Sequence, residues 1–246
     1  MADRELLVLN LGERSYAEVL AFQRDAAARR ITGEIDQDLL ILVEHPPVVT
    51  LGRKKADNKL PVSEDFLRSR GIELFEVERG GGVTFHGPGQ LVGYPIFDLQ
   101  RHKLDLHWYL RQVEEGLIRT LETYGIPGER NTGFTGVWTG GRKIASIGVH
   151  ARTWVTWHGF ALNVTTDLSY FNLMTPCGID GVVMTSMTRE QPERPMTVDT
   201  VGVEAANQFA ALFDLTPRLV TATTFDANAG WLSSSGVDPV PTFADR

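Results

Sequence analysis

The sequence predicts a single mixed domain of the α/β or α+β class, on the basis of two kinds of pattern. Three stretches of the 246-residue chain have the apolar spacing of amphipathic helices, and short apolar or alternating runs typical of strands lie between them. The longest strand region, residues 133–164, indicates antiparallel pairing. Helices and strands do not alternate regularly, so a sheet built from repeated βαβ units is not expected.

The first helix is expected over about residues 15–30. Ser15 and Glu18 have the spacing of a capping box at its start. Arg29 and Arg30 stand at its end, where cations interact favourably with the helix dipole. Both ends of this helix are therefore predicted from local signals.

The second helix begins near residue 106, with Gly125 as its C-cap and Pro127 preventing its continuation. The third covers the stretch VDTVGVEAANQFAALFD from residue 198. In both, the apolar residues are spaced for one buried face. These residues are Leu106, Leu110, Val113, Leu117 and Leu121 in the second helix, and Val198, Val201, Ala205, Phe209 and Leu212 in the third.

Strands are expected at LLVLNLG, LLILVEH, PVVTLG, IELFEVERG and LVGYPIFDL, in addition to the 133–164 region. Gly140 and Gly141 can take the positive φ of a two-residue hairpin turn, which places Lys143 early in the following strand. After about residue 218 the chain is rich in Thr, Ser, Ala, Gly and Pro, with little periodicity. We therefore expect one domain over residues 1–218 and a low-complexity, flexible tail over 219–246.

Composition and charge exclude several classes of protein. A formal net charge of -7 disfavours a non-specific nucleic-acid binder, and no apolar run approaches the length of a spanning helix. The first ten residues, MADRELLVLN, lack the basic, acid-free start of a signal peptide. Together with a single cysteine, this predicts a cytoplasmic protein without disulfides or membrane association.

The most unusual stretch is RGGGVTFHGPGQLVGYP, from Arg79 to Pro95. Its glycines leave backbone N–H groups uncovered and allow a ligand to approach the chain closely. The spacing matches neither a dinucleotide-binding nor a P-loop fingerprint, because the residues that follow favour a strand over a helix. The alternative is a tight β-bulge with a structural His86.

The only cysteine, Cys177, lies in TPCGID, where Pro176 and Gly178 favour a loop or the end of an element. Most isolated cysteines are buried small side chains, and a nucleophilic role would require a nearby cation to favour the thiolate. The candidates are Lys143, His86, His150 and His158, and the sequence alone does not choose among them. A Cys–His pair would suit hydrolysis, whereas a Cys–Lys pair would suit transfer to an amine.

Four motifs together resemble those of one enzyme family. The stretches RGGGVTFHGPGQLVGYPIFDL, GRKIASIGVH, WHGFALNV and TPCGI, in this order and at these distances, are similar to the octanoyltransferases of lipoate synthesis, also called lipoyl(octanoyl) transferases. The resemblance covers about residues 5–215. It implies the mixed sheet flanked by helices that is shared with biotin and lipoate protein ligases.

The resemblance also implies roles for individual residues. Cys177 matches the acyl-carrying nucleophile, and Lys143 matches the residue that lowers the pKa of the cysteine and acts as general acid and base. Acyl binding is assigned to Arg79, Gly80, Gly81, Gly82, Val83, Thr84, Phe85 and His86, to Ser146, Ile147 and Gly148, and to Gly159, Phe160 and Ala161.

The implied reaction moves an octanoyl group from octanoyl acyl carrier protein to a lysine of a lipoyl domain, in the E2 subunits of 2-oxoacid dehydrogenases or in the glycine cleavage H protein. Exchange between thioesters keeps the driving force for amide formation, so neither ATP, another cofactor nor a metal is expected. Phe85, Ile147 and Phe160 are candidate walls of an apolar slot, although ordinary core packing explains them equally well.

A basic surface including Arg142, Arg53, Lys54 and Lys55 is expected to dock the acidic carrier protein, and the chain is expected to be a monomer. Three alternatives remain open at this point. They are an ATP-dependent lipoate-protein ligase on the same fold, a non-catalytic protein that binds acylated carriers, and a thiol hydrolase. The ligase and the binding protein would not depend on Cys177.

Overall fold

The computed structural model describes residues 4–174 and 181–220, and a seven-stranded mixed sheet forms its centre. The order of the strands is β10 (Thr216–Val220), β1 (Glu5–Glu13), β2 (Asp38–Glu44), β6 (Gln90–Ile96), β9 (Val155–Asn163), β8 (Arg142–Arg152) and β7 (Val137–Thr139). β1 is parallel to β10 and β2, and the other neighbours are antiparallel. The predicted class, a mixed sheet flanked by helices, is confirmed.

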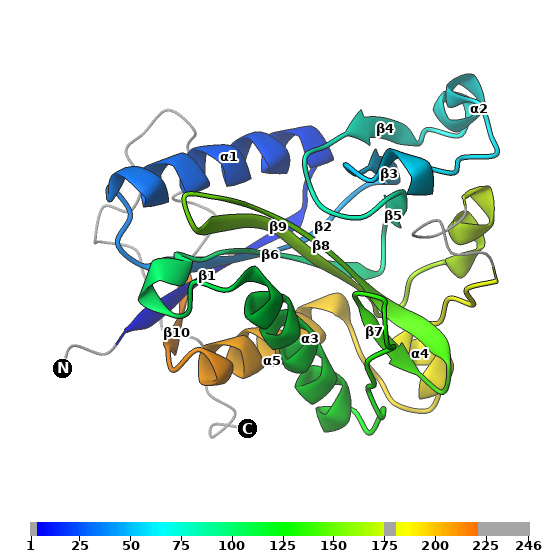
Figure 1. Cartoon of the computed structure of the whole chain (residues 1–246). Helices are drawn as coiled ribbons and strands as arrows, with labels where there is room; N and C mark the ends of the chain where they lie inside the picture. Colours follow the sequence, from blue (N-terminus) through cyan, green and yellow to red (C-terminus); the bar gives the residue numbers. More distant parts are fainter. Residues whose placement is uncertain (1–3, 175–180, 221–246) are drawn as a thin grey trace.

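Helices cover both faces of this sheet (Figure 1). α1 (Tyr16–Thr32) packs on one face, above β6 and β9. α3 (Leu106–Thr123) and α5 (Val198–Leu212) pack against each other on the opposite face. Each face has its own apolar core, because successive residues of a strand point to opposite sides.

A smaller sheet in the order β4 (Glu73–Glu76), β3 (Val48–Leu51), β5 (Thr84–His86) stands beside the larger one. Short helical segments surround it and connect the remaining strands. They are η1 (Lys55–Asp57), α2 (Glu64–Ser69), η2 (Leu99–Arg101), η3 (Leu168–Leu173) and α4 (Met187–Glu190). Because β5 leads directly into β6, the glycine-rich segment before β5 is held at the boundary between the two sheets.

The three predicted helices are confirmed, with small differences at their ends. The Ser15 hydroxyl oxygen accepts a hydrogen bond from the Glu18 N–H at 3.3 Å. The Glu18 carboxylate accepts from the Ser15 hydroxyl and not from the Ser15 N–H, so only half of the capping box is formed. The C-cap of α3 is Tyr124, and the expected Gly125 follows it with φ 73°. Leu106 is 36% exposed and does not join the buried face of α3.

The predicted hairpin between β7 and β8 is also confirmed. Gly140 and Gly141 have φ values of 52° and 76°, and Lys143 is the second residue of β8. The turn between β8 and β9 uses Thr153 and Trp154, with φ values of 50° and 66°. Because neither is a glycine, no local signal predicted this second turn.

The expected domain boundary at residue 218 falls inside β10, so the strand extends two residues into the expected tail. The boundary must be moved, because β10 pairs with β1 along its whole length and buries Val220. Residues 221–246 lie outside the described residues. No described helix is long and apolar enough to cross a membrane.

Candidate active site

Two adjoining hollows lie beside the glycine-rich segment. The inner cavity is bounded by this segment, β5 and the middle of β8 and β9, and it is lined by all the expected acyl-binding residues except Gly80 and Phe85. The outer groove has a volume of about 630 Å³ and is lined by Lys143, Gly80 and the exposed side of α3. Both hollows touch Gly81, Gly82, Ile147 and Gly148, which therefore mark the passage between them.

Arg79 gives the glycine-rich segment its shape. Its guanidinium is buried and donates to the carbonyls of Gly80 and Gly82 at 3.0 and 2.8 Å. It also donates to the carbonyl and hydroxyl of Thr50 on β3, at 2.8 and 2.7 Å. Arg79 lines the inner cavity, but these four bonds show that it also ties the segment to the smaller sheet.

Hydrogen bonds turn the carbonyls of this segment away from the cavity. The carbonyl of Gly81 accepts the Lys54 N–H at 3.1 Å, and that of Gly82 accepts the Gly52 N–H at 3.3 Å. The N–H groups of Gly81 and Gly82, in contrast, have no hydrogen-bond partner among the described residues. These two N–H groups are available to a ligand at the passage between the hollows.

Strand alternation separates the side chains of β5. Thr84 and His86 line the inner cavity, whereas Phe85 points the other way and stacks on Tyr170 with ring centroids 4.5 Å apart. Phe85 is therefore a core residue and not a wall of the cavity. Phe160 lies at the cavity, but its ring stacks on Phe209 of α5 on the opposite face of the sheet. Of the three expected walls, Ile147 lines both hollows.

A chain of buried hydrogen bonds fixes the tautomer of His86. The carbonyl of Thr185 can only accept, so Asn163 Nδ2 donates to it at 2.9 Å. Asn163 Oδ1 then accepts from Gln90 Nε2, and Gln90 Oε1 accepts from His86 Nδ1, each at 2.9 Å. His86 is thus protonated at Nδ1, which leaves Nε2 as a hydrogen-bond acceptor.

Lys143 lies between the sheet and the outer groove and is only 1% exposed. Its Nζ is 5.0 Å from the ring centroid of Trp138, and a Cβ on Gly136 would come within 3.0 Å of its Cε. Its N–H donates to the carbonyl of Val183 at 2.8 Å, and its carbonyl accepts the Thr185 N–H at 2.9 Å. Lys143 is therefore fixed to the segment that follows TPCGID.

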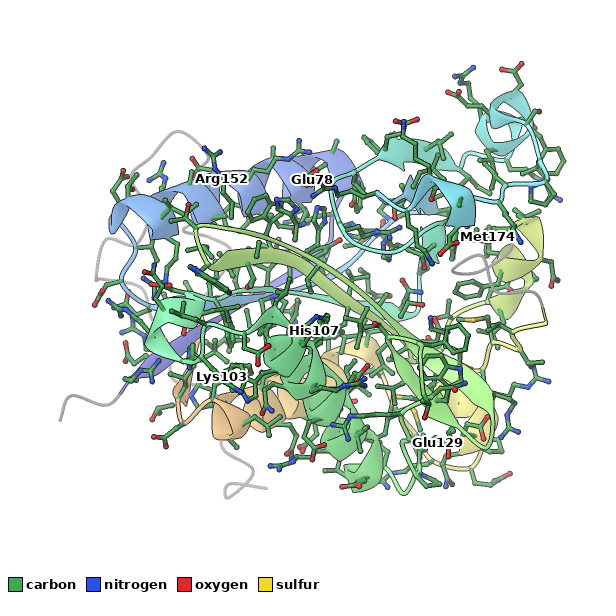
Figure 2. The ribbon with its side chains drawn as sticks, viewed as in Figure 1. Glu78, Lys103, His107, Glu129, Arg152 and Met174 are labelled. Carbon is green, nitrogen blue, oxygen red and sulfur yellow. The ribbon has the colours of Figure 1, made fainter. Side chains whose placement is uncertain are left out.

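Cys177 lies outside the described residues, so its distance from Lys143 stays a prediction. In the sequence it stands three residues after Met174 and six before Val183. Met174 is buried in the core beneath β5, near the end of η3 (Figure 2). Val183 bonds to Lys143 as described above. The preceding segment is thus anchored in the core of the smaller sheet, and the following segment is anchored to Lys143 at the outer groove.

The electrostatics of the site distinguish Lys143 from the other candidate cations. Burial lowers the pKa of His86 to about 3 and also lowers the pKa values of His150 and His158. All three imidazoles are therefore neutral near pH 7, which favours Lys143 as the cation for a thiolate. In residues 4–174 and 181–220, no group of three His, Cys, Asp or Glu side chains is arranged to hold a metal ion.

Several residues at the site were not expected to take part. Tyr16 and Tyr94 line the inner cavity, and Gln90 and Asn163 form the chain of bonds behind it. His158 also lines the cavity, although the sequence suggested it only as a cation. Polar residues within otherwise apolar strands, as in GPGQLV and FALNV, are the signal that could have identified Gln90 and Asn163.

The class of protein follows from this fold and from a family comparison. Residues 15–210 match the lipoyl protein ligase A/B catalytic domain. A solved lipoate protein ligase from Thermoplasma acidophilum superposes with a TM-score of 0.69 at 18% identity, covering 90% of this chain and 88% of that chain. A lipoate-protein ligase A bound with ATP also gives 0.69, at 18% identity and 89% coverage of both chains. At this identity the two structures establish the fold alone.

Sequence relatives narrow the class to one family. An octanoyltransferase from Acidobacterium capsulatum is 46% identical over 89% of this chain and 98% of its own length. One from Solibacter usitatus is 48% identical over 86% of this chain and 94% of its own length. The chain belongs to the octanoyltransferase family and is an acyltransferase. The expected family, fold class and enzyme class are thereby confirmed.

Proposed function

We propose that this protein transfers an octanoyl group from acyl carrier protein to a lysine of a lipoyl domain, through a thioester on Cys177. The octanoyl group is the one for which its relatives are named. The observation that carries the proposal is the position of Lys143, which is buried, lines the outer groove and is bonded to the segment after TPCGID. An acyl chain in the inner cavity would present its carbonyl there.

In the first half-reaction the Cys177 thiolate attacks the carbonyl carbon of the carrier thioester. The new C–S bond forms as the old one breaks, and the carrier leaves as a thiolate that takes a proton. Lys143 holds the Cys177 thiolate as an ion pair and relays the thiol proton of Cys177 to the departing carrier. One thioester replaces another, so no outside energy source is consumed.

In the second half-reaction the amine of the acceptor lysine attacks the Cys177 thioester. Lys143 takes a proton from the attacking nitrogen, and Cys177 leaves as a thiolate as the amide forms. The N–H groups of Gly81 and Gly82 stabilise the negative oxygen in both steps, since they lie at the passage without partners among the described residues. Lys143 thus serves both half-reactions.

The acceptors proposed are lipoyl domains of 2-oxoacid dehydrogenase E2 subunits and the glycine cleavage H protein. We also propose that the enzyme works in the cytoplasm as a monomer, with no metal or other cofactor. Its catalytic domain corresponds to the expected single unit from residue 1, extended through Val220, and the expected tail lies outside the described residues.

The proposed docking surface for the carrier is the loop Arg53, Lys54 and Lys55. All three side chains are exposed, and Lys54 lines the outer groove, although it also pairs with Asp57. Arg142 is a weaker candidate than the sequence suggested, because its Nε and one terminal nitrogen donate to the Glu190 carboxylate and its other terminal nitrogen donates to the Gly140 carbonyl.

Charge reversal tests this surface. The double variant Arg53→Glu and Lys55→Glu should lower kcat/KM for the carrier substrate several-fold at low salt, and the loss should shrink in high salt as charges are screened. Arg152→Glu, at the distant end of β8 (Figure 2), is the matched control. Equal rates for all three proteins at low salt would remove the loop from the docking site.

The transfer assay tests the activity itself. Purified lipoyl domain is incubated with the enzyme and either octanoyl acyl carrier protein without ATP, or free octanoate with ATP, and its mass is followed. The proposal predicts a gain of one octanoyl group only with the carrier substrate. Acylation only from octanoate and ATP would identify a ligase, and loss of the acyl group to water would identify a hydrolase.

A further inference from the structure

The inner cavity has a distinct far end. Gly81, Gly82, Ile147 and Gly148 touch both hollows and mark the side toward Lys143. Tyr16 of α1, Tyr94 of β6 and His158 of β9 are among the residues that line the inner cavity and not the outer groove. An acyl chain that enters from the outer groove therefore has its carbonyl near the four shared residues and its methyl end toward this far group.

The far end contains polar atoms without partners. His158 is 1% exposed, and neither ring nitrogen has a hydrogen-bond partner among the described residues. Its Nε2 is 3.8 Å from a Glu78 oxygen, too far for a hydrogen bond. Behind it, Gln23 is fully buried, and its Nε2 also lacks a partner. Figure 2 shows Glu78 between α1 and the β8–β9 strands.

The backbone holds His158 in an unusual conformation. Its φ is 54°, in the left-handed region that residues other than glycine rarely adopt. Its N–H donates to Gln23 Oε1 at 2.9 Å, which connects α1 to β9. Residues kept in strained conformations cluster at functional sites, and here the strain accompanies a buried imidazole that lines the cavity.

Water can occupy this end when no acyl chain is bound. The inner cavity offers about 40 Å³ of room to water, and one molecule needs roughly 10–15 Å³ of such room. The hydroxyl of Tyr16 makes no hydrogen bond to a described residue and lies on the same lining. Together with the two ring nitrogens of His158 it provides the several polar partners that a buried water requires.

We propose that the polar far end formed by Tyr16 and His158, with Gln23 behind His158, sets the maximum length of the acyl chain. This inference rests on the proposed transfer of octanoyl groups. A chain that stops short of the far end leaves its water in place, and every methylene is buried against apolar walls. A longer chain would displace that water and leave the polar atoms unpaired, which opposes the gain from additional methylenes.

Two substitutions of His158 separate polarity from volume. His158→Gly removes the imidazole, and glycine adopts a positive φ without strain. His158→Asn also reduces the side-chain volume and tolerates the positive φ, but the asparagine side chain keeps polar atoms at this position. Each enzyme is given octanoyl and decanoyl carrier protein in one tube, and the masses of the products give the ratio of the two kcat/KM values. This ratio cancels any change common to both substrates.

The expected result is a rise in the decanoyl-to-octanoyl ratio of roughly tenfold for His158→Gly, the gain from burying about two methylenes. His158→Asn should stay within about threefold of the wild type. Tyr16→Phe, which removes one polar atom at nearly constant volume, should raise the ratio by a few fold. Melting temperatures check that all variants are folded.

Equal rises in the decanoyl-to-octanoyl ratio for His158→Gly and His158→Asn would show that side-chain volume alone limits the length of the acyl chain. Unchanged ratios in all variants would show that other residues limit it. Both results overturn the proposal. If the wild type transfers neither group, the proposed function fails, and the same comparison is made on the Kd values of octanoyl and decanoyl carrier protein for each variant. The predicted ratios then apply to binding.

Discussion

Two buried polar clusters differ in how many of their polar atoms have hydrogen-bond partners. In the Asp38 cluster, one carboxylate oxygen accepts from Arg30 and from the Asp98 N–H, and the other accepts from His102 at 2.6 Å. In the far end of the cavity, both ring nitrogens of His158 lack hydrogen-bond partners among the described residues, and Nε2 lies 3.8 Å from a Glu78 oxygen. The first cluster joins α1, β2 and the segment after β6, whereas the second faces a hollow.

The difference separates residues that stabilise the fold from residues that serve the substrate. An unpaired buried polar atom destabilises a protein unless water or a ligand satisfies it. The Asp38 cluster leaves one such atom, Arg30 Nε, whereas the cavity region leaves both nitrogens of His158, Nε2 of Gln23 and two glycine N–H groups. Changes in the first cluster should therefore alter stability, and changes around the cavity should alter catalysis.

The largest expected effect is on catalysis. Lys143→Met keeps the length of the side chain but removes the ammonium, so transfer should fall about 10²–10⁴-fold. The melting temperature should change little, because the methionine side chain fills nearly the same volume. Steady-state rates and thermal unfolding measure the two effects.

The control for this prediction is Lys103→Met, which changes an exposed lysine at the start of the segment before α3 (Figure 2). It should leave the rate within about twofold, since exposed ion pairs contribute little. If Lys143→Met lost activity because it unfolded, the assignment of the residues around the cavity to catalysis and not to stability would be contradicted.

The next effect is on stability. Asp38→Asn leaves Arg30, itself 5% exposed, without its main counter-charge, so the free energy of unfolding should fall by about 3 kcal/mol. The octanoyl transfer rate per folded molecule should be unchanged. Chemical denaturation measures the first quantity and an active-site titration the second. A lowered rate at unchanged stability would reverse the assignment of this cluster.

A smaller loss of activity is expected from Gly136→Ala. The added Cβ would lie 2.7 Å from the carbonyl of Ala145 and 3.0 Å from Cε of Lys143, at a φ of 139°. Transfer should fall roughly tenfold as Lys143 is displaced. Gly133→Ala also has a positive φ, but its Cβ would meet no atom within 4 Å, so it isolates the backbone strain. Equal losses in both variants would exclude displacement of Lys143.

A further prediction concerns the pH dependence of stability, which differs between the regions. Burial lowers the pKa of His86 to about 3 and that of His45 to about 4, so the unfolded chain binds more protons below pH 6.5. Stability should therefore fall with acidification between pH 6.5 and 4, by at most about 1.4 kcal/mol per pH unit for each histidine. His86→Gln should remove one histidine's share of this slope.

The Asp38 cluster should respond only at lower pH. Burial raises the pKa of Asp38, but hydrogen bonds from His102 and Asp98 outweigh it and lower the pKa overall. The stabilising contribution is present above about pH 4 and is lost as pH falls below it. Denaturation curves from pH 3 to 7 measure both regions. An unchanged slope in His86→Gln between pH 6.5 and 4 would contradict this division.

The sequence predicted the elements whose signals are local. α1, α3, α5 and the Gly140–Gly141 turn were found because caps, apolar spacing and glycines lie within a few residues of one another. β10 was missed as a strand because it is a short edge strand that contains Pro217 and is defined by its pairing with β1.

The site was predictable only in part. The expected acyl-binding residues lie together because β8 and β9 pair opposite the glycine-rich segment, and this arrangement came from the family resemblance. Strand alternation could have shown that Phe85 points away from its neighbours. The bond between Gln23 and His158 joins residues 135 positions apart, so no local pattern could have revealed it.

The central claim, covalent transfer through Cys177, is tested most directly by the intact mass of the enzyme after brief incubation with octanoyl acyl carrier protein, without ATP. Wild type should gain one octanoyl group and lose it when lipoyl domain is added, as that domain gains the same mass, and Cys177→Ala should show no gain. An enzyme that transfers octanoyl groups without a mass gain, or a Cys177→Ala variant that retains full activity, would contradict the claim.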